Sequence, residues 1–450
     1  MQQLNPNLGE YIKQHYQFAF MLILWSISGI WGGPAYLGII PLSVILLKRK
    51  KMYVELICGL FYLMVLSDSW SLAMTWAGNV KNIYMLMLAL FVIFDPKEFR
   101  YKNTLFYPFI PYMLLATILI TQSPDFMATF QKTLSYILLL TIIPAYYNKL
   151  LEEQPEKFLK GLIYTATCLL LYGFMLIVIS YNTAYLIGRF RGVMGNPNGL
   201  GIFCTVLFAF FTITINKYKN LFSRNEIIMI YGAILISVFL SGSRNTVLSI
   251  LIFFGFSRLF KVSYWLGFTI IITIGVVYQV ILANLTDIMT AMGVSEYMRA
   301  DKFEEGSGRI VAWKFAWDKI QENFLFGKGI GYEGWLFYQN AQYLYTKGHI
   351  GNSHNSWLAT WLNTGIVGLL LFLFGLIYSF VKASVKSPYA LPLMYAVLFS
   401  ATFEAWLVGS LNPHTPLVLL MWTLMKFDVK EEGIEKKLTF DKYKIPSLAT

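Results

Sequence analysis

The feature that most constrains this chain is a series of long apolar blocks with almost no charged residues. Residues 158–180 and 265–285 are examples, and each block is long enough to cross a hydrocarbon layer of roughly 30 Å as a helix. Only 13% of the 450 residues are charged, whereas a soluble domain usually has about 25%. Backbone amides inside lipid must pair with one another, and no ten-residue alternation indicates a barrel. We therefore predict an all-α, polytopic membrane protein.

Fourteen apolar segments occur along the chain, and we expect 12–14 of them to cross the membrane. The first, second, sixth and last have only about fifteen apolar residues, a length that also suits a tilted, re-entrant or interfacial helix. No repeat indicates the two inverted halves of a transporter. The predicted spans are 17–31, 33–47, 52–68, 78–94, 103–121, 133–147, 158–181, 198–216, 226–241, 245–260, 264–285, 354–381, 389–410 and 412–427.

A long hydrophilic stretch near the C-terminal end divides the chain into parts. Residues 1–285 are predicted to form an N-terminal transmembrane bundle of about 11 spans, and residues 286–353 a long exoplasmic loop. Residues 354–427 would form the C-terminal spans, and residues 428–450 a cytoplasmic tail. The loop is longer than a connection requires, which usually indicates function.

Part of this loop has the pattern of an amphipathic helix. Ile310, Trp313, Trp317 and Ile320 recur at helical spacing, and charged residues occupy other positions of the same segment. We expect this helix to lie at the membrane interface with its indoles among the lipid headgroups. Three alternate glycines within 327–331 then predict a flexible turn.

The net charge of +12 is explained by the distribution of the basic residues. The basic clusters fall on every second loop, as expected for the cytoplasmic side of a membrane protein, so nucleic-acid binding is disfavoured. This pattern predicts a multi-pass protein of the cytoplasmic membrane with both termini cytoplasmic. The first fifteen residues lack the charged-then-apolar order of a cleaved signal peptide, so the first span should remain as an anchor. The clusters are Lys48-Arg49-Lys50-Lys51, Lys97/Arg100/Lys102, Lys149/Lys157/Lys160, Lys217/Lys219/Arg224, Arg258/Lys261, Lys382/Lys386 and Lys426 onward.

Four arginines lie on the opposite, exoplasmic side in this topology, where basic residues are disfavoured. Arg189 and Arg191 are flanked by glycines, Arg244 follows Ser241-Gly242-Ser243, and Arg309 follows Gly306-Ser307-Gly308. Glycine lets the backbone approach a ligand closely, and guanidinium groups bind phosphate oxygens in pairs. Arg244 and Arg309 also stand at predicted helix starts, where free amides favour an anion. The alternative is that each arginine extends its side chain to lipid headgroups.

Asn196 and Asn198 follow the first arginine pair in Asn196-Pro197-Asn198-Gly199 and open the next predicted span. Capping of that helix explains them, because proline suits a first helical turn. Polar contacts to a sugar are the alternative.

His354 begins a predicted span on the same side as the arginines, next to Asn355, which is a further candidate for binding the substrate. Its imidazole could accept a proton from an alcohol, or could form a structural hydrogen bond only. Glu404 is predicted inside the span 389–410, and a carboxylate in a bilayer is usually paired or functional. Its expected partner is one of the four arginines. No metal-ligand spacing and no nucleotide-binding glycine motif occurs in the sequence, so no metal or cofactor is expected.

The segment after the long loop carries the motif of a known family. His354-Asn355, nine intervening residues, and Gly365-x-x-Gly368 match the hallmark of the O-antigen ligase and polymerase superfamily of bacterial membrane glycosyltransferases, which this chain resembles. Leu369 stands where the ligase form often has threonine, a departure that argues against a ligase in particular.

The resemblance extends over residues 241–370. Gly308-Arg309 followed by Trp313, the glycine-rich stretch 327–331 and the Ser241–Arg244 turn also resemble the family. The resemblance implies the type C glycosyltransferase fold and glycan transfer from undecaprenyl diphosphate on the exoplasmic face. Arg244 and Arg309 would match the arginines that bind the diphosphate, and His354 the residue that activates the acceptor hydroxyl.

The chemistry of the residues agrees with this implication. A lipid diphosphate is already an activated leaving group, so arginines can supply the charge stabilisation, and a direct displacement would be metal-independent and inverting. The favoured activity is a polymerase joining repeat units of a surface polysaccharide, with a chain-length regulator as a candidate partner. A ligase acting on a lipid A-core acceptor, a protein O-glycosylating relative, a lipid-linked saccharide flippase and a structural scaffold are the alternatives.

Overall fold

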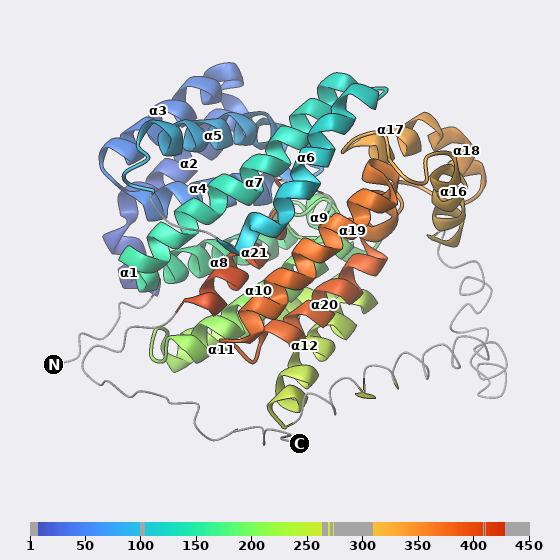
Figure 1. Cartoon of the computed structure of the whole chain (residues 1–450). Helices are drawn as coiled ribbons and strands as arrows, with labels where there is room; N and C mark the ends of the chain where they lie inside the picture. Colours follow the sequence, from blue (N-terminus) through green and yellow to red (C-terminus); the bar gives the residue numbers. More distant parts are fainter. Residues whose placement is uncertain are drawn as a thin grey trace, which may run out of the picture.

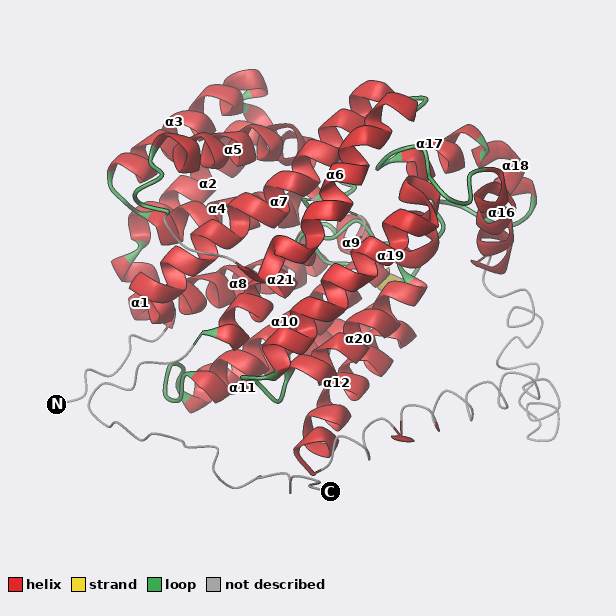
Figure 2. Ribbon diagram, viewed as in Figure 1, coloured by secondary structure: helices red, strands yellow, loops and turns green. Residues whose placement is uncertain are grey.

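The computed structural model describes residues 8–99, 104–262, 269–270, 273, 309–407, 409 and 411–427. The described part is a bundle of helices with one short two-stranded hairpin, shown by element in Figure 1 and by secondary structure in Figure 2. Six described helices are long and apolar enough to cross a membrane, which confirms the prediction of an all-α polytopic membrane protein. They are Leu72–Phe94 (η2 and α5), Phe126–Glu153 (α7), Pro155–Ile179 (α8), Pro197–Lys217 (α10), Arg224–Ser241 (α11) and Ser356–Ser384 (α19).

Further apolar helices are shorter, so the number of spans stays a prediction. They are Tyr16–Trp31 (α2), Tyr53–Ser67 (α4), Phe106–Gln122 (within η3, α6 and η4), Ala390–Phe403 (α20) and Thr415–Lys426 (α21). The remaining helices of the bundle are Leu8–Gln14 (α1), Gly33–Ala35 (η1), Tyr36–Arg49 (α3), Tyr181–Ala184 (α9) and Arg244–Val262 (α12).

Two predicted spans differ from the structure. The segment 133–147 was expected to be short, but α7 has 28 residues because its helical pattern continues through polar residues at both ends. The segment 389–410 was expected to be one helix, but α20 ends at Phe403 and Glu404 has extended backbone angles. Most of the predicted span 264–285, the loop up to residue 308 and the tail 428–450 lie outside the described residues.

Helix α10 is the most enclosed of the six candidate spans. Of its most apolar window, 83% is buried, and it packs against α11, α12 and α21. Asn196 accepts a hydrogen bond from the amide of Gly199 (2.7 Å) and caps this helix, while Pro197 occupies its first turn. Because α10 is held on several sides, the polar residues at its first turn have a fixed position.

Helix α19 is kinked at the first glycine of the Gly-x-x-Gly motif. Gly365 has φ +70° and ψ 179°, angles that favour glycine. A Cβ at this position would lie 2.1 Å from the carbonyl oxygen of Leu325. The amide of Ile366 donates to the carbonyl of Phe324 (2.9 Å), so the kink lets the preceding loop pair with the helix backbone.

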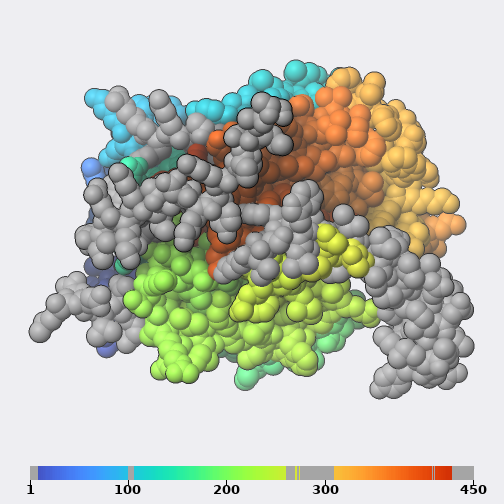
Figure 3. Space-filling view, turned by 60° about the horizontal axis from the view of Figure 1, so that its bottom comes forward, coloured from blue at the N-terminus to red at the C-terminus, as the bar shows by residue number. Residues whose placement is uncertain are grey.

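The described part of the long loop forms a small domain with its own core. It contains α16 (Arg309–Glu322), α17 (Tyr332–Gln339) and α18 (Ala341–Thr346), and α16 and α17 pack against α19. In Figure 3 this domain, coloured light orange, lies at one side of the molecule beside the darker orange of α19.

The predicted amphipathic helix is present as α16, and its residues divide between the protein core and the surface. Ala312, Ala316 and Ile320 are the buried positions, whereas Ile310 is 53% and Trp317 46% exposed. Small alanine side chains at i and i+4 allow α16 to approach its neighbours closely, so bulky residues are left on the flanks.

Candidate active site

Five of the candidate residues reach one place from five separate segments. Arg189 lies in the short strand β2 (Arg189–Phe190), which pairs with β1 (Tyr185–Leu186), and Asn198 is in the first turn of α10. Arg309 begins α16, His354 lies just before α19, and Glu404 directly follows α20. The site therefore combines the transmembrane bundle with the loop domain.

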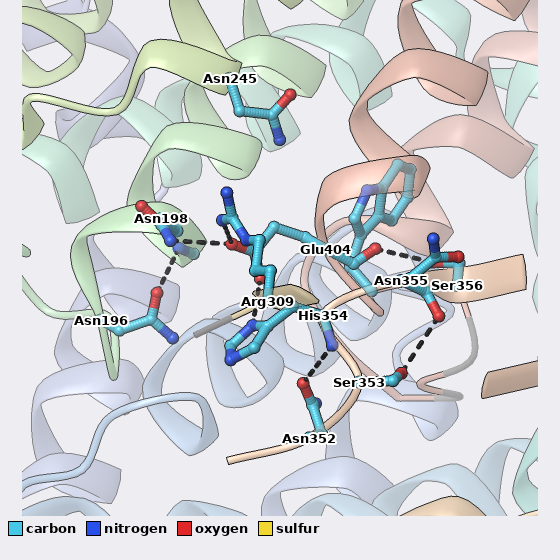
Figure 4. A network of polar contacts seen from close by, with 12 residues as sticks. Asn196, Asn198, Asn245, Arg309, Asn352, Ser353, His354, Asn355, Ser356 and Glu404 are labelled. Atoms are coloured by element: carbon cyan, nitrogen blue, oxygen red, sulfur yellow. Dashed lines mark hydrogen bonds and ion pairs between the residues drawn. The ribbon is translucent and has the colours of Figure 1, made fainter. Parts of the chain in front are cut away.

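The carboxylate of Glu404 joins these segments (Figure 4). Its Oε1 accepts hydrogen bonds from a terminal nitrogen of Arg309 (2.9 Å) and from Nδ2 of Asn198 (2.8 Å). Its Oε2 lies 3.1 Å from Nδ1 of His354. The expectation that Glu404 pairs with one of the arginines is confirmed by this geometry. Its predicted position inside a helix is wrong, since the chain leaves the helix at the residue whose side chain makes these contacts.

Glu404 is fixed by its backbone as well as by its side chain. The hydroxyl of Ser356 donates to the carbonyl oxygen of Glu404 (2.8 Å) and accepts from the amide of Leu407 (3.3 Å). Glu404 is only 9% exposed, so its negative charge is compensated mainly by protein groups.

His354 is held in a backbone conformation that is uncommon for a residue with a side chain. Its φ is +46°, and its amide donates to Oδ1 of Asn352 (3.0 Å). The amide of the preceding Ser353 donates to Oε1 of Glu333 (2.8 Å), and Nε1 of Trp313 donates to the carbonyl oxygen of Ser353 (3.0 Å). These contacts fix the loop in the conformation that turns the imidazole toward Glu404.

The surroundings of His354 change its pKa in opposite directions. Burial lowers the pKa, but the hydrogen bond and the negative charge of Glu404 outweigh this effect and raise it above the ordinary value, while Arg309 opposes the rise. The imidazole is therefore a stronger base than a histidine in water.

The guanidinium of Arg189 connects β2 to two other elements. Its Nε donates to the carbonyl oxygen of Ser241 (2.8 Å), and a terminal nitrogen donates to Oδ1 of Asn198 (2.9 Å). Burial lowers the pKa of Arg189, Glu404 opposes this, and the charges of Arg309 and Arg244 lower it further. Arg244 is therefore electrostatically coupled to the same site, from the first position of α12.

Three guanidinium groups of the described residues, those of Arg189, Arg244 and Arg309, are electrostatically coupled around the carboxylate of Glu404. Guanidinium groups gathered in this way suit an anion with several oxygens, such as a diphosphate.

Three other candidate residues have local structural contacts instead. Arg191 donates to the backbone carbonyls of Thr183 (2.9 Å) and Gly195 (3.1 Å), which fixes the loop before α10. Asn355 accepts from the amides of Trp357 (2.9 Å) and Leu358 (3.1 Å) and so caps α19. The third, Asn196, caps α10 as already described.

A second polar cluster supports the segments that meet at Glu404. Nζ of Lys81 donates to the hydroxyl of Ser67 (3.0 Å) and to the carbonyl oxygen of Leu411 (3.1 Å), in the loop after α20. Asp68, directly after α4, accepts a hydrogen bond from the backbone of Gly195 and interacts electrostatically with Lys81. Lys81 thus ties the loop that carries Glu404 to the end of α4.

Several contributing residues were not singled out from the sequence. Ser356, Asn352 and Glu333 act through contacts between segments, and their sequence neighbourhood gives no signal of this. Lys81 had one signal, because it is among the few basic residues on the exoplasmic side of the predicted topology. Within the described residues, no group of three or more histidine, cysteine or acidic side chains could hold a metal ion.

Fold and site together define a polytopic α-helical membrane protein with a basic, histidine-containing site at the ends of its helices. Residues 227–373 match the family described as O-Antigen ligase. This match supports the O-antigen ligase and polymerase superfamily for the chain, and with it an O-antigen ligase-type membrane glycosyltransferase. No curated protein matches the chain. The matched residues include Arg244, Arg309 and His354.

Proposed function

We propose that this protein transfers a saccharide from undecaprenyl diphosphate to an acceptor hydroxyl, and that it joins the repeat units of a surface polysaccharide. The observation that carries the proposal is the contact of one carboxylate, that of Glu404, with both Arg309 and His354. Arginine suits the binding of a diphosphate and histidine suits proton transfer, and the proposed reaction needs both.

The diphosphate would be bound by Arg309, Arg244 and Arg189. As the bond between the anomeric carbon and the diphosphate oxygen breaks, negative charge grows on the leaving group. Fixed guanidinium groups stabilise that charge without reorganisation. The contacts of Arg189 with Asn198 and Ser241 support such a fixed position.

His354 would act on the acceptor. With Nδ1 directed at Glu404, the opposite nitrogen, Nε2, would accept the proton of the hydroxyl as its oxygen attacks the anomeric carbon, and the acceptor would replace the hydrogen bond of the imidazole with the backbone of Ile350. Glu404 stabilises the imidazolium that forms, and the released diphosphate stays paired with the arginines. A direct displacement of this kind inverts the anomeric carbon and requires no metal.

Two further activities share this donor. A ligase would use the same groups and differ in its acceptor, lipid A-core, and the family description favours keeping it as the second candidate. A flippase for lipid-linked saccharide would need the arginines but not the histidine–carboxylate contact.

Purified protein with an undecaprenyl-diphosphate repeat unit, incubated with and without lipid A-core, tests these alternatives. A ladder of products without core supports the polymerase, and a single product that requires core supports the ligase. Absence of transfer to either acceptor, with donor still moved across proteoliposomes, would exclude the enzyme and favour the flippase.

A further inference from the structure

The turn between α16 and α17 exposes three consecutive large apolar side chains. Phe324 is 40% exposed, Leu325 59% and Phe326 49%. A contiguous apolar surface of this kind on a hydrophilic loop indicates a partner that removes it from water.

The turn is attached to the kink of α19. The carbonyl of Phe324 accepts from the amide of Ile366 (2.9 Å) and from Nε1 of Trp361 (3.1 Å). A few residues later, the amide of Gly329 donates to the carbonyl of Asn363 (2.8 Å). The position of the turn relative to the membrane is therefore set by the position of this part of α19.

The length of α19 places the kink at a membrane boundary. From Gly365 to its end at Ser384, the helix rises roughly 30 Å at about 1.5 Å per residue, which equals the thickness of the hydrocarbon layer. Lys382, in the last turn, marks the far boundary. The kink and the attached turn accordingly lie at the boundary on the side of the loop domain.

The exposed apolar surface of α19 leads to this turn. Four residues at helical spacing form an exposed stripe along α19, and Ile366 and Val367, which pair with the turn, lie nearer the kink along the same helix. Continuity with a lipid-facing stripe favours lipid over a protein partner. The stripe residues are Leu370 (59% exposed), Phe374 (60%), Ile377 (45%) and Val381 (50%).

Aromatic rings surround the turn in the manner of a membrane interface. The ring of Trp361 is 5.2 Å from that of Phe324 and 5.5 Å from that of Trp317. Exposed Phe126 and Phe130 stack at the start of α7, which also contacts the glycine-rich stretch after the turn. Aromatic residues are enriched at the level of the lipid headgroups.

We propose that the turn formed by Phe324, Leu325 and Phe326 inserts into the lipid leaflet on the side of the loop domain and attaches that domain to the bilayer. The partner is the acyl-chain region of membrane lipids. The turn would thus act as a membrane anchor for the loop domain, independently of the reaction proposed above.

Spin labels in proteoliposomes test this inference through the accessibility of each label to oxygen and to a water-soluble nickel reagent. The exposed Cys168 is first replaced by alanine, while Cys58 and Cys204 are buried. A label at Leu325→Cys is compared with two references, Leu370→Cys on the stripe and Tyr345→Cys on α18, where the side chain is 69% exposed.

The label at Leu325 is expected to resemble the label at Leu370, with high accessibility to oxygen and low accessibility to nickel. A label that resembles the one at Tyr345 would overturn the inference, because the turn would then lie in water. Low accessibility to both reagents would also overturn it, because protein, from this chain or a second copy, would cover the turn. Phe326→Cys gives the same test if Leu325→Cys does not fold.

Discussion

Replacement of Glu404 by glutamine tests how the imidazole of His354 is oriented. The carboxylate accepts from Arg309 and Asn198 at one oxygen and faces Nδ1 of His354 with the other. In Glu404→Gln the amide oxygen can remain with the two donors, so the amide NH2 group would face His354. Nδ1 must then accept a hydrogen bond, and the neutral ring carries its proton on Nε2. That nitrogen can no longer accept the proton of the acceptor hydroxyl.

The expected loss of activity is large for a substitution that changes only one atom type. General-base catalysis contributes about 10²–10⁴-fold, and the same carboxylate-to-amide change in a serine protease triad costs about 10⁴-fold. We expect kcat for Glu404→Gln to decrease by about 10²–10⁴-fold. The KM for the donor should change less, because the arginines remain.

The pH profile gives a second readout. His354 acts as a base only when neutral, so the wild-type kcat/KM should rise with pH through a pKa above the ordinary 6.5. Loss of the negative charge of Glu404 removes the main influence that raises this pKa. The remaining activity of the variant should therefore increase with pH through a lower pKa than that of the wild type. Glu404→Asp is a control that keeps a carboxylate at this position.

The assay is transfer from purified lipid-linked donor in proteoliposomes across a pH series, with protein levels measured in parallel. Wild-type kcat with an unchanged pH profile in Glu404→Gln would refute the proposed orientation of His354.

Three further predictions concern other residues of the site and the kink of α19. His354→Ala and Arg309→Ala should leave protein levels intact and abolish glycan extension, and products of normal length on a gel from either variant would remove that residue from the mechanism. Gly365→Ala should destabilise the protein by about 1–3 kcal/mol or more, because the new methyl group would overlap the carbonyl of Leu325, and a melting temperature equal to that of wild type would contradict this. Lys81→Met should lower kcat without loss of the helical circular dichroism signal, because it releases the loop that carries Glu404, whereas unchanged kcat would show that the loop is held by other contacts.

The sequence predicts the helices well where hydrophobicity and capping agree. The starts at Pro197 and Arg244 follow from a proline–asparagine cap and from a Ser–Gly–Ser turn, which are local signals. The end of α20 was missed because no local signal stops the apolar run at Glu404. The helix ends there because contacts with Ser356 and Arg309, distant in sequence, stabilise an extended backbone.

The candidate site was likewise predicted in part, where local sequence signals exist, and missed where distant contacts decide. Charge pattern and motif spacing identified Arg189, Arg309 and His354. The structure brings Arg309 and His354 to the carboxylate of Glu404, and Arg189 to Asn198, which also binds that carboxylate. Arg191 shares the glycine-flanked pattern with Arg189, yet its guanidinium contacts backbone carbonyls. Arg189 lies in β2, whereas Arg191 stands just beyond its end, where the chain leaves the hairpin and turns toward α10, so the place where the strand ends decides which guanidinium faces the site.

The amount of undecaprenyl diphosphate released per saccharide joined tests the central claim most directly. Mass spectrometry of a reaction with purified protein and lipid-linked donor would measure both products, in wild type and in His354→Ala. We expect one diphosphate lipid for each new glycosidic bond in the wild type, and neither product from the variant. Donor that disappears without a diphosphate product, or equal release by His354→Ala, would contradict the account.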